Sequence, residues 1–288
     1  MKKTLTLIIS LLIVACILLT GCAGKYDKGS SVIRWGTRIV LNTDMPDSPD
    51  KLNYYAAVSP EITAGWVQDI GDKLGILDEV RSSPGGSRFI MSEGDEYLEV
   101  NGDNGAVTVR GLHIPYGTDN SLSSSENAAV IAEEFVKYLG LWDDNIELKE
   151  VVLRYEDIPI KQEWGVYFRQ DVGGYPMVGA AKHFHVIVNP YGTILKAGFY
   201  NPELQYAGEV DCITVRDAYD LFLDGEALDF IFSPSIKKVE VNEVYIGYYI
   251  ESQTELQECF MPVYVFEGEL LTSGGDTEVF RACVMAAK

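Results

Sequence analysis

The sequence predicts an α+β fold in which helices pack on one face of antiparallel sheets. Three segments repeat their apolar residues at three- and four-residue spacing, which is the period of an amphipathic helix. Several strand-like segments follow each of them, so the order of one helix and then several antiparallel strands occurs three times. With 288 residues, 47% of them hydrophobic, the chain can bury a sizeable core.

The three helices have recognisable beginnings and ends. We expect the first to begin at Pro60 behind a Ser59 cap, and the second to begin behind Ser123, which has capping-box spacing to Glu126. The third is expected to begin at Thr214. A glycine can end each helix because glycine adopts the left-handed conformation of a C-cap at little cost. These glycines are Gly75, Gly140 and Gly225.

The remaining apolar segments predict strands. A hairpin is expected where residues 97–100 and 106–109 flank the turn-forming run Asn-Gly-Asp-Asn-Gly. A polar, turn-rich stretch follows at residues 116–125 and suggests a boundary. We therefore expect an N-terminal α+β domain at residues 32–120 and a C-terminal α+β domain at residues 121–288.

The N-terminus predicts an export signal that is not part of the fold. Lys2 and Lys3 precede an uncharged run that is too short for a comfortable membrane-spanning helix and is typical of a signal peptide. The sequence Leu-Thr-Gly-Cys ending at Cys22 resembles the lipobox of bacterial lipoproteins. That resemblance implies cleavage before Cys22 and acylation of its thiol, and so a signal peptide at residues 1–21.

The small polar residues at 22–31 then form a flexible tether. The protein is expected at the outer face of the cytoplasmic membrane, held there by the lipid on Cys22. With 43 acidic residues against 23 basic ones, its formal net charge is −20. This balance argues against nucleic-acid binding, and it predicts that an anionic membrane repels the protein body.

Five cysteines leave the redox state open. Cys16 belongs to the signal and Cys22 to the anchor, which leaves Cys212, Cys259 and Cys283. Cys259 and Cys283 lie in neighbouring strand-like segments and form the preferred disulfide pair. Three buried free cysteines are the alternative.

Several segments resemble the PepSY and thermolysin-propeptide families. The strand, Gly-Gly turn and Tyr-Pro-Met-Val-Gly segment at 165–179, the helix start at 213–218 and the Phe-Met-Pro-Val-Tyr-Val-Phe strand at 260–266 carry the resemblance, which spans residues 124–287. The layout is also similar to extracytoplasmic regulators of cell-wall histidine kinases in Gram-positive bacteria. This resemblance implies a binding or inhibitory module rather than a catalyst.

Motifs for catalysis are missing from the sequence. It contains no GxSxG, HExxH, Walker or GxGxxG pattern, and we expect no catalytic residues and no cofactor. His183 and His185 share one face of a predicted strand and could hold a metal if a carboxylate joined them. An exposed strand face with two imidazoles is the preferred interpretation, so no metal site is expected.

Three residues are candidates for contact with a partner. Tyr245 and Tyr249 lie on one face of a predicted strand, where they form either core or an exposed aromatic strip. Arg169 is either a partner-contacting residue or one half of a structural ion pair.

Three hypotheses for function follow. The first is a lipid-anchored, extracytoplasmic, non-enzymatic binding or regulatory protein that modulates an unknown envelope protease or sensor. The second is a secreted carbohydrate-active enzyme or other hydrolase that uses a carboxylate pair, which no sequence motif reveals. The third is a structural envelope protein.

Overall fold

The fold is described from a computed structural model of the chain. The described residues are 28–58, 60–115, 124–155, 162–179, 184–251 and 257–288. The expected signal peptide, Cys22 and most of the expected tether lie outside them. Within them the protein is mostly β, with three helices, one large mixed sheet and one small antiparallel sheet. This arrangement confirms the predicted α+β class.

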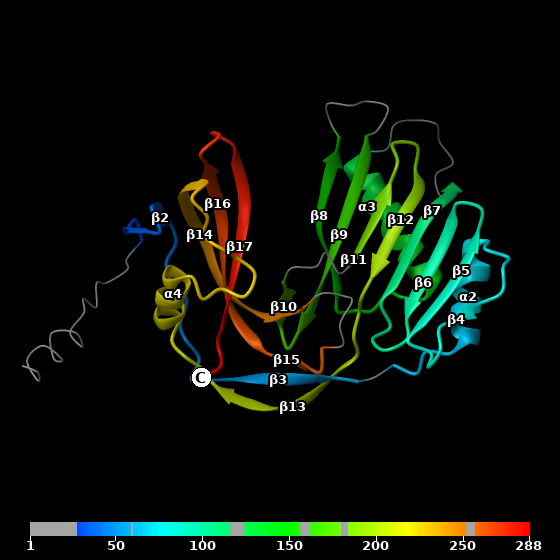
Figure 1. The fold of residues 1–288 in the computed structure, drawn as a ribbon, viewed down its shortest axis with the longest axis horizontal. Coiled ribbons are helices and arrows are strands. Elements are labelled where there is room, and N and C mark those ends of the chain that lie inside the picture. Colours follow the sequence, from blue (N-terminus) through cyan, green and yellow to red (C-terminus); the bar gives the residue numbers. More distant parts are fainter. Residues whose placement is uncertain (1–27, 59, 116–123, 156–161, 180–183, 252–256) are drawn as a thin grey trace, which may run out of the picture.

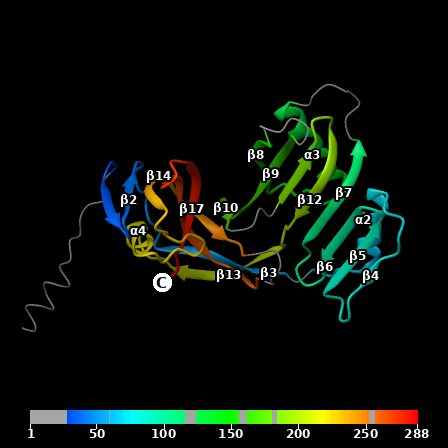
Figure 2. The ribbon, with the colours of Figure 1, turned by 45° about the horizontal axis from the view of Figure 1, so that its top comes forward.

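One lobe consists of a broad sheet that is covered on one face by two helices, α2 (Ala64–Leu74) and α3 (Ser125–Leu139) (Figures 1 and 2). Apolar side chains of both helices and of the sheet form a single core. The strands of this lobe, which we name the α2–α3 lobe, are β4 (Arg81–Ser82), β5 (Arg88–Glu93), β6 (Glu96–Asn101), β7 (Val107–Pro115), β8 (Ile146–Arg154), β9 (Glu163–Val172), β11 (Phe184–Val188) and β12 (Thr193–Phe199).

The other lobe, the α4 lobe, packs helix α4 (Val215–Asp224) on a second group of strands. Phe222 stacks on Phe266, with ring centroids 5.3 Å apart, and Tyr219 lies against the same ring. These three side chains are almost fully buried and fix the helix to the sheet. The strands are β1 (Ser31–Arg34), β2 (Thr37–Leu41), β14 (Ile236–Tyr249), β16 (Pro262–Thr272) and β17 (Thr277–Met285).

Short strands join the two lobes at their base (Figure 1). Strand β10 (Tyr175–Val178) pairs antiparallel with β9 of one lobe and parallel with β14 of the other. The small sheet lies below it, in the order β13 (Leu204–Asp211), β3 (Lys51–Ala57) and β15 (Cys259–Phe260). The parallel pairs of β14 with β10 and with β2 make the large sheet mixed, whereas the sequence predicted antiparallel pairing throughout.

Two of the three helices are capped by residues other than the predicted ones. Thr63 is the N-cap of α2 and accepts a hydrogen bond from the Trp66 amide, so this helix begins four residues later than expected. Ser124, not Ser123, caps α3. The capping box of Thr214 and Asp217 on α4 is present. Glycines in the left-handed conformation end all three helices, as predicted.

The expected division at residue 120 falls outside the described residues, and the chain pairs across it. Strand β7, before the division, pairs with β12 after it. Strand β2, near the N-terminus, pairs with β14. The first two helix-then-strand units therefore share one sheet and one core, while the N-terminal strands belong with the third unit.

Candidate functional site

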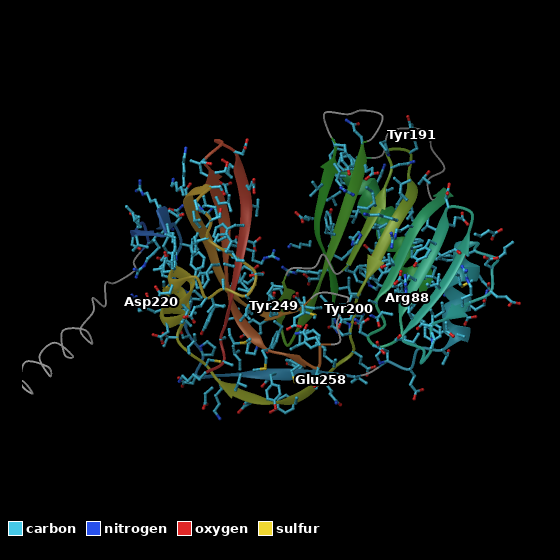
Figure 3. All side chains as sticks on the ribbon, in the orientation of Figure 1. Arg88, Tyr191, Tyr200, Asp220, Tyr249 and Glu258 are labelled. Atoms are coloured by element: carbon cyan, nitrogen blue, oxygen red, sulfur yellow. The ribbon has the colours of Figure 1, made fainter. Side chains whose placement is uncertain are left out.

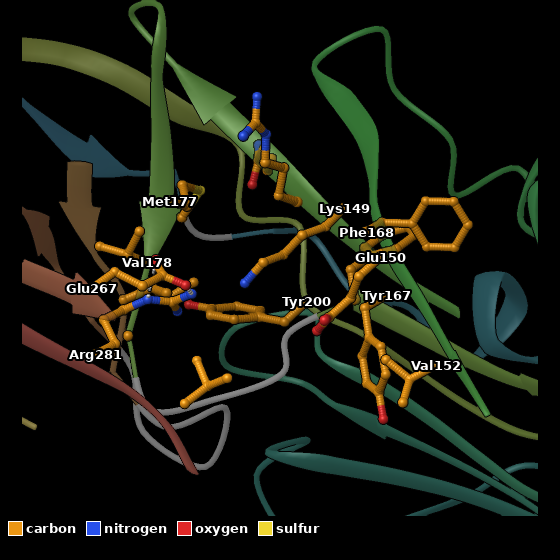
Figure 4. A pocket seen from close by; sticks show the side chains of 16 residues that line it. Lys149, Glu150, Val152, Tyr167, Phe168, Met177, Val178, Tyr200, Glu267 and Arg281 are labelled. Atoms are coloured by element: carbon orange, nitrogen blue, oxygen red, sulfur yellow. Dashed lines mark hydrogen bonds and ion pairs between the residues drawn. The ribbon is translucent and has the colours of Figure 1, made fainter. Parts of the chain in front are cut away.

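A cleft lies between the two lobes, above β10. Two adjoining cavities of about 450 and 590 Å³ occupy it, within the usual size range of ligand sites. Both are lined by Lys149, Arg169, Glu267 and Arg281, together with Met177 and Val178 from β10. Figure 4 shows Lys149 pointing into the cleft from one lobe, opposite Glu267 and Arg281 of the other.

Two edge strands line this cleft from opposite sides. In the described part of the chain, β8 pairs only with β9, and β17 pairs only with β16. Val152 of β8 and Val279 of β17 both line the 450 Å³ cavity, and Val279 is 79% exposed. Each strand therefore turns a row of backbone donors and acceptors away from its own sheet.

The hydrogen bonds at Cys283 identify the outward-facing groups of β17. The Cys283 amide donates to the Asp229 carboxylate at 2.8 Å, and the Cys283 carbonyl accepts from the Leu228 amide at 2.8 Å. Because backbone direction alternates along a strand without a register shift, the amides and carbonyls of Val279 and Arg281 face the same way. The loop at 228–229 occupies one end of the β17 edge, and the remainder faces the cleft.

Glu267 is the centre of a polar network on the α4-lobe wall. It accepts a hydrogen bond of 2.6 Å from the Tyr245 hydroxyl and pairs with the Arg281 guanidinium at 3.3 Å. Burial by itself would raise the pKa of Glu267, but the hydrogen bonds from Tyr245 and Arg281 outweigh burial and lower it. The carboxylate is therefore held ionised at the cleft.

Tyr200 lines the smaller cavity of the cleft, whereas Tyr249 lines neither cavity. Tyr200 lies between the lobes and runs toward Arg281 and Glu267, and Tyr249 lies on the α4-lobe side (Figures 3 and 4). Burial raises the pKa of the Tyr200 hydroxyl, with a further contribution from Glu251. The Tyr200 hydroxyl is consequently neutral at physiological pH.

The structure brings two of the three predicted contact residues to this cleft. Arg169 pairs with Glu147 at 2.9 Å and with Asp171 at 3.3 Å, and it lines both cavities. Tyr245 lines the larger cavity. Tyr249 instead packs against a buried valine cluster, and burial raises its pKa to about 12.

The histidines form no metal site among the described residues. His183 lies outside them. His185 is half-buried on β11, and its ring lies 6.2 Å from that of Tyr167. The described residues contain no group of three metal-ligating side chains. They also contain no helix that is long and apolar enough to cross a membrane.

The expected disulfide between Cys259 and Cys283 is not formed. Cys212, Cys259 and Cys283 are all free. Cys283 is buried on β17, whereas Cys259 is exposed on β15 and pairs with Ala56 of the small sheet. Nearness in sequence order misled the prediction, because the two strands belong to different sheets.

The carboxylates of the cleft bear on the hydrolase hypothesis. Glu150 and Glu267 line the 450 Å³ cavity, and Glu243 lines the larger one. A general acid needs a raised pKa. Among the described carboxyl groups, only that of Asp171 has a clearly raised pKa, caused by burial and opposed by Arg169, and Asp171 lines neither cavity.

Sequence reasoning missed Lys149, Glu267 and Arg281. Lys149 enters the cleft where the register of β8 shifts between Leu148 and Glu150. No local sequence pattern predicts this register shift. Glu267 and Arg281 face each other across β16 and β17. Pairing the two predicted strands as a hairpin would have found that contact, since opposite charges face each other in that register.

Comparisons with known proteins give a distant structural match. No protein-family model and no curated protein matches the chain. An uncharacterized protein from Eubacterium rectale ATCC 33656 aligns over 90% of each chain, with a TM-score of 0.47 and 12% identity. The Bacillus megaterium YpeB C-terminal domain aligns over 77% of this chain and 98% of its own, with a TM-score of 0.39 and 10% identity. This chain thus has distant structural similarity to both.

Proposed function

We propose that this protein is a lipid-anchored, extracytoplasmic binding protein that holds an extended segment of another envelope polypeptide in the cleft between its lobes. The observation that carries the proposal is the pair of edge strands, β8 and β17, that line one cleft from opposite sides. The resemblance of residues 124–287 to PepSY modules is consistent with a binding or inhibitory role, and the lipobox at Cys22 with an anchored one.

Backbone hydrogen bonding favours a polypeptide as the occupant. An unpaired strand edge presents donors and acceptors at the spacing of another strand, which is the basis of β-strand addition. The loop at 228–229 already uses the β17 edge at Cys283, where the Leu228 amide donates to the Cys283 carbonyl and the Asp229 side-chain carboxylate accepts from the Cys283 amide. An incoming segment would continue along the same edge at Arg281 and Val279.

The charge of the cleft supports the same assignment. Its smaller cavity is lined by three basic residues, Lys149, Arg169 and Arg281, and two acidic ones. The whole chain has the opposite balance, with a net charge of −20. Acidic or neutral segments therefore meet less repulsion in the cleft than elsewhere on this protein.

Site-specific cross-linking in intact cells tests the proposal. A photo-reactive amino acid at Val279 is expected to capture one partner polypeptide. The same amino acid at Leu77, which is equally exposed but lies in the α2–α3 lobe and lines neither cavity, is expected to capture none. Equal capture at both positions would contradict the proposal. Hydrolysis by purified residues 23–288 that one substitution in the cleft abolishes would favour the second hypothesis instead.

A proline substitution separates edge pairing from side-chain contact. With the photo-reactive amino acid moved to Val152 of β8, which lines the same cavity, Val279→Pro removes an amide that faces the cleft and leaves the ladder to β16 intact. Capture at Val152 should then fall while the fold is retained. Val279→Ala is the matched control, because it shortens the side chain and keeps the amide. If Val279→Pro binds its partner as well as Val279→Ala does, the segment does not pair with this edge.

A further inference from the structure

The hairpin of β1 and β2 carries apolar side chains that the core does not use. Ile33 is 75% exposed and Trp35, at the tip, is 67% exposed. Trp35 has a φ of 55°, a left-handed conformation that is costly for a non-glycine residue. Gly36, which follows it, also has a positive φ and completes the tight turn.

The hairpin is the first element after Cys22 in the described part of the chain. Eight residues lie between Cys22 and Ser31, so the nine residue steps of a fully extended tether span about 30 Å at most. If the lipid on Cys22 lies in the membrane, the hairpin lies within that reach of the bilayer surface. Figure 1 shows β2 at the outer end of the α4 lobe, on the side away from the cleft.

Charge distinguishes this segment from the rest of the chain. Residues 28–38 contain Lys28, Arg34 and Arg38 and no acidic residue, whereas the whole chain has a net charge of −20. Asp224 of α4 pairs with Arg34 at 3.8 Å and offsets part of that charge. The hairpin is thus a basic, apolar protrusion on an acidic body.

We propose that the tip of the β1–β2 hairpin enters the interface of the bilayer. Trp35 and Ile33 would lie among the lipid headgroups, where amphipathic aromatic rings are favoured, and Arg34 and Arg38 would meet lipid phosphates. This inference rests on the lipid anchor of the proposed function. The contact orients the α4 lobe toward the membrane and leaves the cleft open to partners.

Two observations favour the bilayer over a protein partner as what the hairpin tip contacts. They are the short reach of the tether and the local positive charge. The net charge predicts that the membrane repels the acidic body. At physiological salt this repulsion is largely screened at separations greater than about 8 Å. A protruding basic hairpin can therefore contact anionic headgroups while the body remains farther away. The membrane contact is local and does not require a basic surface on the whole protein.

Tryptophan fluorescence on vesicles tests this proposal without native lipidation. The mature chain with Cys259→Ser is coupled through Cys22 to a maleimide lipid, in vesicles of brominated phosphatidylcholine with about one third phosphatidylglycerol. We expect the emission of Trp35, obtained by subtracting the Trp35→Phe variant, to be quenched and shifted to the blue. Unquenched emission of Trp35 on tethered protein would overturn the proposal.

Two matched variants complete the test. Leu77→Trp in the Trp35→Phe background places an indole at another exposed position, in the α2–α3 lobe, and its emission should not be quenched. Arg34→Gln with Arg38→Gln should reduce the quenching of Trp35 on anionic vesicles more than on neutral ones. Quenching at both Trp35 and Leu77→Trp would mean unspecific adsorption and would also overturn the proposal. Capture at Val279 is a separate readout, so failure here leaves the proposed cleft function to its own test.

Discussion

The hydroxyl of Tyr245 on β14 donates a hydrogen bond of 2.6 Å to the carboxylate of Glu267 on β16. Arg281 of the edge strand β17 pairs with the same carboxylate. One acidic residue thereby ties together three neighbouring strands at the wall of the cleft. Because Arg281 also belongs to the free edge of β17, this network fixes a side chain that a bound segment would meet.

Loss of the Glu267 carboxylate should destabilise the α4 lobe. Glu267→Gln leaves Arg281 without its charged partner, in a site where only about a quarter of either side chain is exposed. We expect the free energy of unfolding to fall by about 1–2 kcal/mol. Urea denaturation measures this change, and Glu269→Gln, an exposed residue of the same strand, is the control. Equal effects of the two substitutions would argue against the network.

The same network predicts how stability depends on pH. The folded state lowers the pKa of Glu267 below its ordinary value, so the folded protein binds fewer protons there than the unfolded chain does. The contribution is present above the unfolded pKa of about 4.3 and is lost as the pH falls through the folded value. The difference in stability between wild type and Glu267→Gln should therefore shrink below about pH 4. A difference that grows on acidification would contradict the assignment.

Gly179 should tolerate no side chain. It has a φ of 146°, and a Cβ there would overlap the carbonyl oxygen of Ile250. That contact accompanies a hydrogen bond of 2.7 Å from the Ile250 amide to the Val178 carbonyl, which holds β10 to the α4 lobe. We expect Gly179→Ala to lower stability by more than about 2 kcal/mol.

Gly174→Ala is the matched control for this prediction. Gly174 also has a positive φ, of 83°, but nothing lies within 4 Å of a Cβ built on it. Its substitution should cost about 1–2 kcal/mol from backbone strain alone. Thermal or chemical denaturation compares the two. A Gly179→Ala variant as stable as Gly174→Ala would mean that the lobes are not joined through this contact.

The three thiols of the folded region should differ sharply in reactivity. Cys259 is exposed, while burial raises the pKa of the Cys212 and Cys283 thiols, with Asp229 adding to the rise at Cys283. In purified residues 23–288, which contain only these three cysteines, a thiol reagent should label one cysteine quickly in the folded protein and three after unfolding. Only one reactive thiol in the unfolded, unreduced protein would instead indicate a disulfide.

Local patterns predicted the elements that short-range physics controls. The 3.6-residue period identified the helices, and Gly75, Gly140 and Gly225 end them because a C-cap needs a residue that tolerates a positive φ. The start of α2 was misplaced because Ser59 and Thr63 both fit the cap pattern. Only the hydrogen bond from the Trp66 amide to Thr63 distinguishes them.

The sequence by itself determined the α+β class, the three helix-then-strand units and two of the cleft residues, Arg169 and Tyr245. It could do so because capping, turn chemistry and apolar spacing act over a few residues. Tertiary structure alone decided that the first two units share one sheet, that β2 joins β14, and that β8 and β17 line one cleft. Those pairings join strands far apart in the chain, and their choice depends on which edges the whole fold leaves free.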